Sequence, residues 1–200
     1  MRTIALAAFL SISLAALPNL SAQQFSAQPS TILEKPRKAP EFTIVEPTGK
    51  KMLLSSYRGK VVVLAFISTE CPHCQKECEM LSQLYTEMKP KGVQILASAF
   101  NDGAAVRVPG FIQAHHVNFP VGYTDPESVL SFQSFSVMDR PSVPQVAVID
   151  KKGMIRAQTP PPGDVNLQDE GYLRDLLTKL AGEGISATPI HKASVKTGSR

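Results

Sequence analysis

Residues 59–92 read GKVVVLAFISTECPHCQKECEMLSQLYTEMKPKG and contain three local patterns in a fixed order. The first is an unbroken apolar, β-branched run at 61–67, which is typical of a central parallel strand buried on both faces. The second is Cys-Pro-His-Cys at 71–74, and the third is a helical pattern that ends at Pro90 and Gly92. A strand, a C-x-x-C and a helix in this order predict a thiol–disulfide active site.

The two cysteines of this site are expected to differ in exposure. Pro72 suits the first helical position, where its missing N–H costs nothing. This places Cys71 at the helix N-terminus, where free N–H groups favour an attacking thiolate. Cys74 lies one turn further on, more shielded, and can close a small disulfide ring. A structural disulfide or half a zinc site is the alternative, but the sequence has no second C-x-x-C and no H-x₃₋₅-H.

Length and charge limit the function classes. The chain has 200 residues and 43% hydrophobic content, enough for one domain with tails. Its formal net charge of +4 comes mainly from the two ends, so the folded part is close to neutral and nucleic-acid binding has no electrostatic basis. We divide the chain into a signal peptide at 1–22, a flexible tether at 23–38, a folded domain at 39–182 and a disordered tail at 183–200.

The N-terminus predicts export to the periplasm or the extracellular space. Arg2 is a short basic region, an apolar run follows at 4–17, and Ala22 offers a small residue for cleavage. The alternative is an uncleaved anchor, but the run is shorter than the ~20 residues a membrane span needs. An exported chain with Cys71, Cys74 and Cys78 has an odd number of cysteines, which leaves one to explain.

The remaining elements follow from periodicity and turn residues. The first helix has a buried stripe at steps of three or four: Cys74, Cys78, Leu81, Tyr85 and Met88. Its third cysteine therefore points inward, as a small core residue. We expect strands at 42–45, 52–54, 93–100, 119–121, 145–149 and 154–158, a helical turn at 55–58, and helices at 108–116, 126–135 and 171–180.

Four features within 39–180 carry a family resemblance: TGK…SSYRGK at 48–60, CPHC at 71–74, the insertion at 108–121, and VPQVAVIDKKG at 143–153. Together they resemble the TlpA/ResA-like thiol–disulfide oxidoreductases of the AhpC/TSA–redoxin superfamily. The resemblance implies a thioredoxin-like α/β fold. Its central mixed β-sheet would be flanked by helices, with an αβ insertion and an extra N-terminal strand or hairpin.

The resemblance also implies roles for single residues. Cys71 would attack and Cys74 resolve, while Glu77 would take the proton of Cys74. Val143–Pro144 would be a cis peptide bond that faces the disulfide, and the backbone of Val143 would pair with a substrate chain beside Pro72. The alternatives are a surface charge at the glutamate and an ordinary trans proline.

The resemblance implies an exported monomer that acts as a reductase and exchanges its disulfide with envelope proteins. A membrane thiol-transfer partner would exchange electrons with it. No cofactor or metal is required. Two residues depart from the family pattern, and opposing effects of Glu70 and His73 leave the redox direction open. Glu70 replaces the family's tryptophan and opposes a thiolate at Cys71, and Glu79 replaces a proline. Conversely, Pro72-His73 is the dipeptide of DsbA-type oxidants, in which a charged histidine favours the reduced thiolate.

Two rival functions use the same segment. Cys74 and Cys78 have the spacing of Sco-like copper-binding metallochaperones, which also need a distant histidine, and the candidates are His73, His115, His116 and His191. A peroxiredoxin-like thiol peroxidase needs a proline where Leu64 stands, and a supporting arginine for which Arg140 is the candidate. We expect neither.

Overall fold

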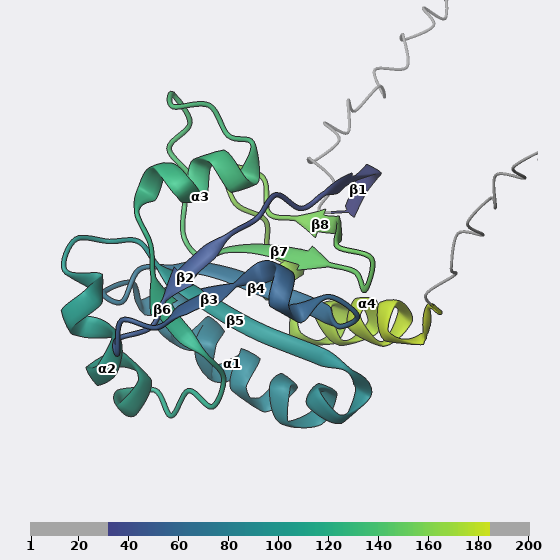
Figure 1. Cartoon of the computed structure of the whole chain (residues 1–200), viewed down its shortest axis with the longest axis horizontal. Helices are drawn as coiled ribbons and strands as arrows, with labels where there is room; N and C mark the ends of the chain where they lie inside the picture. The colour runs from purple at the N-terminus through teal and green to yellow at the C-terminus, as the bar shows by residue number, and fades with distance from the viewer. Residues whose placement is uncertain (1–31, 185–200) are drawn as a thin grey trace, which may run out of the picture.

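The computed structural model describes residues 32–184, which form one eight-stranded sheet in the order β1-β8-β7-β4-β5-β6-β2-β3. Two hydrophobic clusters lie on its two faces. Helices α1 (Pro72–Met88), α2 (Ala104–Ala114) and α4 (Glu170–Gly182) contribute to one cluster, and α3 (Pro126–Gln133) to the other (Figure 1). The predicted α/β architecture, a mixed sheet flanked by helices, is confirmed.

The centre of the sheet is strand β4 (Val61–Ile67), which is buried along its whole length. It runs parallel to β5 (Val93–Ala99) and antiparallel to β7 (Gln145–Ile149). Alternate residues enter opposite cores: Val63 packs in the cluster under α1, and Phe66 packs in the other. A strand with apolar partners on both faces needs the unbroken apolar run that the sequence has.

Helix α1 follows β4 after a short loop. Its predicted buried stripe is confirmed, because Cys74, Cys78, Leu81, Tyr85 and Met88 are all buried. The helix passes into the short 3-10 turn η2 (Lys89–Lys91), which ends at Gly92 in the left-handed conformation with φ of 84°. Glycine adopts this conformation at no steric cost, so the chain can turn directly into β5.

The N-terminal edge differs from the prediction. Residues Ile32–Lys38, placed in the tether, form strand β1, which pairs antiparallel with β8 (Met154–Gln158). Ile32 lies opposite Ala157, and Arg37 donates to the Phe132 carbonyl and to Gln158 Oε1, both at 2.7 Å. An edge strand is held by backbone pairing and needs no apolar pattern, so composition does not reveal it. The predicted signal peptide and nearly all of the tail lie outside the described residues.

The αβ insertion is also displaced from its predicted bounds. Helix α2 begins at Ala104 rather than 108, so Pro109 lies inside it. Burial of Ala104, Val108 and Phe111 at helical spacing offsets the hydrogen bond that a proline removes. Strand β6 (Val121–Tyr123) lies two residues later than expected, where it pairs with both β5 and β2.

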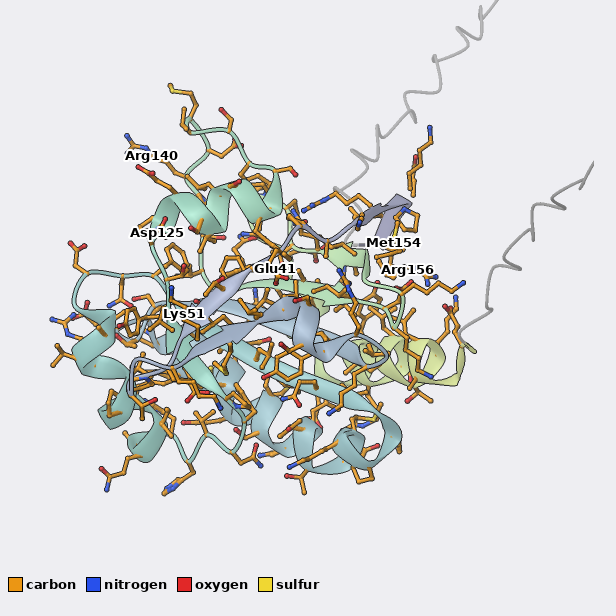
Figure 2. The ribbon with its side chains drawn as sticks, in the orientation of Figure 1. Glu41, Lys51, Asp125, Arg140, Met154 and Arg156 are labelled. Atoms are coloured by element: carbon orange, nitrogen blue, oxygen red, sulfur yellow. The ribbon has the colours of Figure 1, made fainter. Side chains whose placement is uncertain are left out.

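A close approach fixes β6 against the N-terminal hairpin of β2 (Thr43–Val45) and β3 (Lys51–Leu53). A Cβ atom added to Gly122 would lie 2.3 Å from the carbonyl oxygen of Val45. Only glycine fits there, which explains the small residue in the middle of a strand. In Figure 2, the label Lys51 locates β3, and the label Asp125 locates the residue directly before α3.

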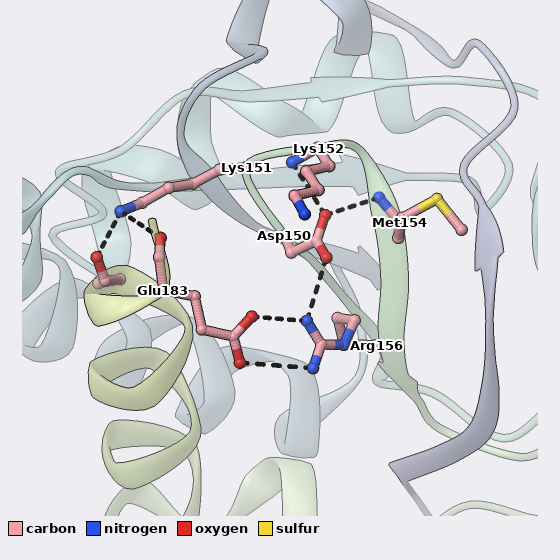
Figure 3. Close-up of polar contacts among 7 residues, drawn as sticks. Asp150, Lys151, Lys152, Met154, Arg156 and Glu183 are labelled. Atoms are coloured by element: carbon pink, nitrogen blue, oxygen red, sulfur yellow. Dashed lines mark hydrogen bonds and ion pairs between the residues drawn. The ribbon is translucent and has the colours of Figure 1, made fainter. Parts of the chain in front are cut away.

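The β7–β8 turn is tied to the end of α4 by a polar network (Figure 3). Asp150 Oδ1 accepts hydrogen bonds from the backbone N–H groups of Lys152 and Met154, both at 2.9 Å. Its Oδ2 accepts from Arg156 at 3.1 Å, and that guanidinium also pairs with Glu183 at 2.8 Å. The ammonium group of Lys151 donates to two carbonyls at the helix end, those of Ala181 and Glu183.

Replacing Asp150 with alanine is expected to lower the free energy of unfolding by about 2 kcal/mol, because two backbone N–H groups and a guanidinium lose a charged acceptor. Urea unfolding of the purified variant measures this. Lys152→Ala is the matched control: the residue is exposed and keeps its backbone N–H, so its stability should not change. Equal stabilities of the two variants would contradict this role for the network.

Candidate active site

Cys71 is the N-cap residue of α1 and is partly exposed. Its Sγ lies 3.8 Å from the carbonyl oxygen of Val143, which reaches the site from the segment before β7. The peptide bond between Val143 and Pro144 is cis. The structure therefore brings together two segments that are about seventy residues apart and that the family resemblance assigned to one site.

Cys74 lies one turn into α1 and is fully buried. Burial raises the pKa of its thiol to about 12, and the nearby Cys71 and Glu77 add to this rise. The backbone N–H of Ser68, 3.4 Å from Cys74 Sγ, acts in the opposite direction by donating to the sulfur. The pair therefore consists of one accessible thiol and one thiol that holds its proton until a base removes it.

Glu77 lies on the same face of α1 as Cys74, three residues further on. It is only 4% exposed, and its Oε1 atom has no hydrogen-bond partner in the described part of the chain. Desolvation raises the pKa of its carboxyl to about 8. A buried carboxyl that is half ionised near pH 8, next to a protonated thiol, can exchange protons with it.

Cys78 lies one turn below Cys74 and is also fully buried, within the cluster that α1 shares with α4. Desolvation raises the pKa of its thiol, and the charges of Cys74 and Glu77 raise it further. A thiol that ionises this reluctantly is a poor nucleophile, so its place is that of a core side chain.

Pro72 and His73 occupy the first two positions of α1, and both side chains are exposed beside Cys71. Pro144 is buried, whereas Val143 is only partly covered and packs against the core cluster under α1. All seven predicted site residues thus belong to two segments, the N-terminal part of α1 with its N-cap and the two residues directly before β7.

The sequence did not predict two polar contacts that hold the loop before Cys71. Glu70 pairs with Arg107 of α2 at 2.6 Å, and the backbone N–H of Thr69 donates to Asn101 Oδ1 at 3.0 Å. The charge that was expected to oppose a thiolate is therefore partly balanced by an arginine. No pattern in the sequence links residue 107 to residue 70, because only the packing of the insertion joins them.

Gln145 was missed as well. It follows Pro144 and is fully buried. Its Nε2 donates to the carbonyl of Ser142 at 2.7 Å and to that of Pro160 at 3.3 Å. The side chain therefore joins the segment that carries Val143 to the loop after β8.

Among the described residues, the side chains of the rival functions are not assembled, and the candidate ligand His191 lies outside those residues. His115 lies 2.9 Å from Glu79, and among residues 32–184 no group of three His, Cys, Asp or Glu side chains is placed to hold a metal. Arg140, the candidate arginine of a peroxidase, is exposed on the loop between α3 and β7. Neither rival gains support from the geometry.

A cleft of about 610 Å³ lies away from the cysteines, between the N-terminal hairpin and α3. Figure 2 labels three of its charged side chains, Glu41, Lys51 and Asp125. Glu41 accepts from the backbone N–H of Ser55 at 3.1 Å, and Asp125 caps α3 by accepting from Ser128 at 2.8 Å. Both carboxylates already stabilise local structure, so the cleft is not assigned a function.

Comparisons with known proteins identify the family of this chain. The AhpC/TSA family model matches residues 36–158. The chain is 30% identical over 141 residues to the thiol-disulfide oxidoreductase ResA of Bacillus anthracis, covering 70% of this chain and 77% of that protein. It is 31% identical over 123 residues to ResA of Bacillus thuringiensis subsp. konkukian, covering 62% and 68%.

Solved structures show the same fold. The structure is similar to a thiol:disulfide interchange protein of the thioredoxin family from Chlorobium tepidum, with a TM-score of 0.61, 22% identity, and coverage of 74% of this chain and 98% of that one. A thiol:disulfide interchange protein from Bacteroides sp. has a TM-score of 0.61, 18% identity, and coverage of 80% and 97%. The predicted thioredoxin-like fold and ResA-like resemblance are confirmed, and the chain belongs to the AhpC/TSA family, among its TlpA/ResA-like redoxins.

Proposed function

We propose that this protein is an exported thiol–disulfide oxidoreductase that reduces disulfides of envelope proteins with its Cys71–Cys74 pair. The observation that carries the proposal is the pairing of an accessible thiol at the N-terminus of α1 with a buried thiol beside a buried carboxyl. The name of the ResA relatives, thiol-disulfide oxidoreductase, supports the same reaction.

The reaction has two exchange steps. The Cys71 thiolate bonds to one sulfur of the partner's disulfide, that S–S bond breaks, and the other sulfur leaves as a thiolate. The Glu77 carboxylate then takes the proton of Cys74, whose sulfur bonds to Cys71 Sγ and displaces the second partner sulfur. The partner disulfide gains two electrons, and the Cys71–Cys74 pair is oxidised.

The residues around the sulfurs position the partner. The carbonyl oxygen of Val143, 3.8 Å from Cys71 Sγ, is placed to accept a hydrogen bond from the backbone of an incoming chain. Pro72 is exposed at the approach, buried Pro144 follows Val143 in the same segment, and His73 adds a titratable group beside the attacking sulfur. No organic cofactor or metal enters these steps. A membrane thiol-transfer partner would return the pair to the dithiol form.

Export rests on the N-terminal pattern, with its basic residue, apolar run and cleavage-type alanine. Within residues 32–184, no helix is both long and apolar enough to cross a bilayer. Secretion of the full chain fused to a reporter that is active only outside the cytoplasm tests export, and removal of residues 1–22 should abolish the reporter signal.

The reduction potential tests the direction of the reaction. Equilibration with glutathione buffers, in a Cys78→Ala background, should give a value near the thioredoxin end of the scale, about −270 mV. A value toward about −120 mV would contradict a reductase and indicate a disulfide donor. Turnover of insulin, with dithiothreitol as electron source, separately tests whether the protein reduces a protein disulfide at all.

The Glu70–Arg107 pair should tune this potential. Arg107→Gln leaves the carboxylate next to Cys71 unopposed, which disfavours the thiolate, so we expect a potential about 10 mV more negative. Glu70→Gln should shift it by about the same amount in the positive direction. The effects are small because both side chains are about half exposed, at 61% and 48%, and water screens them. Shifts of the same sign in both variants would contradict this account.

A further inference from the structure

Asn101 is a polar side chain at the reactive end of the sheet, in the loop between β5 and α2. Strands β4 and β5 run side by side and parallel (Figure 1), with Ile67 opposite Ala99. The backbone N–H of Phe100 donates to the carbonyl of Ile67 at 3.2 Å. This register brings the residues that follow β4 against those that follow β5, so Asn101 lies beside the loop that leads to Cys71.

The side chain of Asn101 binds two polar groups of Thr69. Its Oδ1 accepts from the backbone N–H of Thr69 at 3.0 Å, and its Nδ2 donates to Thr69 Oγ1 at 3.0 Å. The Nδ2 atom also donates to the carbonyl of Asp102 at 3.2 Å, which fixes the orientation of the amide group. Thr69 is only 8% exposed, so its N–H would be left without an acceptor if the Asn101 oxygen were removed.

The peptide unit between Ser68 and Thr69 connects this contact to the first cysteine. Its N–H is the group that Asn101 accepts, and its carbonyl accepts from the backbone N–H of Cys71 at 3.2 Å. Because a peptide unit is planar, holding its N–H also sets the direction of its carbonyl. Gln75 holds only the following carbonyl, that of Thr69, at 3.4 Å. Asn101 is thus the side chain that fixes this peptide unit from the side of β5.

The backbone N–H of Ser68, one peptide unit earlier, faces the second cysteine. It donates to Cys74 Sγ at 3.4 Å. Burial raises the pKa of Cys74, whereas this N–H lowers it. A thiolate that is cut off from water needs such a donor, because a hydrogen bond to an ionised acceptor is about twice as strong as one between neutral groups. The position of the Ser68 N–H therefore affects how readily Cys74 becomes a nucleophile.

We propose that Asn101 is a positioning residue for the second exchange step, and that it holds the Ser68 N–H on the sulfur of Cys74 while that sulfur is anionic. The inference rests on the proposed function, since it concerns one step of that reaction. In this step the Cys74 proton passes to Glu77, and the thiolate bonds to Cys71 Sγ. The bond between Cys71 and the partner breaks, and the partner's sulfur leaves as a thiolate with the bonding electron pair.

The first exchange step should depend much less on Asn101. The sulfur of Cys71 is partly exposed at the N-terminus of α1, where water and the free N–H groups of the first turn stabilise a thiolate. The sulfur of Cys74 is fully buried one turn further on and lacks both of these. Loss of Asn101 should therefore affect the two steps unequally, whereas general damage to the site would slow both.

Separate measurement of the two steps tests this role in Asn101→Ala. The rate at which Cys71 forms a mixed disulfide with dithiobis(nitrobenzoate), in a Cys74→Ser background, reports the first step and should not change. For the second step, the mixed disulfide is formed at acidic pH in protein that retains Cys74 and is then brought to neutral pH by rapid mixing. Release of thionitrobenzoate should be about tenfold slower than in the wild type.

Three further variants make the test specific. Asn101→Asp keeps an oxygen that accepts from the Thr69 N–H and should restore most of the rate of the second step. Asn101→Ser, with a side chain too short for that contact, should behave like the alanine variant. Asp102→Ala is the matched control, because this neighbour is exposed and keeps its backbone carbonyl, so both steps should proceed at the rates of the wild type.

An unchanged second step in the alanine and serine variants, or equal slowing of both steps, would overturn the positioning role while the oxidoreductase function stands. Failure of Asn101→Asp to restore the rate, or the same slowing in Asp102→Ala, would overturn it as well. A wild type that forms no mixed disulfide at Cys71, or that does not release the second thiol, would overturn the proposed function and the positioning role with it.

Discussion

Serine in place of Cys71 is expected to reduce the rate of insulin disulfide reduction by roughly 1000-fold or more, to the background rate of dithiothreitol alone. A hydroxyl group at the N-terminus of α1 cannot form the mixed disulfide, and the buried thiols of Cys74 and Cys78 cannot replace it. Insulin precipitation, followed by turbidity, measures the loss.

Cys74→Ser should act at the second step instead. Cys71 can still attack, but no internal thiol resolves the product, so a mixed disulfide with the partner accumulates. Non-reducing gels and intact-mass measurement detect this adduct, which dithiothreitol should release. Cys78→Ala is the control and should retain most of the activity. Full activity in both Cys71→Ser and Cys74→Ser would show that the assignment of the redox pair is wrong.

The second large effect is expected for Glu77→Gln and concerns the pH dependence of stability. Burial raises the pKa of this carboxyl to about 8 in the folded protein, from 4.5 for an ordinary glutamate. Between these two pH values the folded state holds a proton that the unfolded state has lost. The wild type should therefore lose stability as the pH rises from about 4.5 to about 8, by an amount on the order of 5 kcal/mol.

Glutamine cannot ionise, so the variant should lack this slope. Urea unfolding should show similar stability for both proteins near pH 4.5 and a more stable variant above pH 8. Glu34→Gln, a change at an exposed position on β1, is the control and should follow the wild type closely. Parallel curves for wild type and Glu77→Gln would mean that the carboxyl is not desolvated in the folded state.

The same variant tests proton transfer from Cys74. We expect resolution of the mixed disulfide to be slowed about 100-fold near pH 8, because the acceptor for the thiol proton is gone. Single-turnover release of a thiol from a preformed mixed disulfide isolates this step from the attack of Cys71. An unchanged resolution rate would exclude Glu77 as the proton acceptor.

Much of the fold follows from local sequence patterns. Strands β4, β7 and β8 have the predicted bounds: β4 and β7 are short apolar runs, and β8 follows the turn at Lys151-Lys152-Gly153. The core of the site was likewise predictable, because Cys71, Cys74 and Glu77 follow each other at steps of three residues in one helical segment. Val143 and Pro144 entered only through the family resemblance, and the 3.8 Å contact between the Val143 carbonyl and Cys71 Sγ agrees with it.

The remainder depends on tertiary contacts that no local pattern encodes. Arg107 meets Glu70 only because α2 packs on the sheet, and Gln145 has its role only because the loop after β8 passes beside Ser142. Strand β1 is held by backbone pairing and by Arg37, both of which depend on β8. Helix α2 was misplaced because Pro109 suggested a boundary that burial of its neighbours overrides.

The register of β1 has a practical consequence for assay design. Ile32 lies opposite Ala157, so β1 begins beside the C-terminal end of β8. The C-terminal ends of β8 and β4 lie on the same side of the sheet, and Cys71 follows β4 there. Helix α4 instead ends beside Lys151, in the β7–β8 turn, at the opposite end of these strands. A biotin or affinity tag fused after α4 will therefore attach the protein to a sensor with its reactive end toward the solution, whereas a bulky tag fused just before β1 will crowd the cysteines.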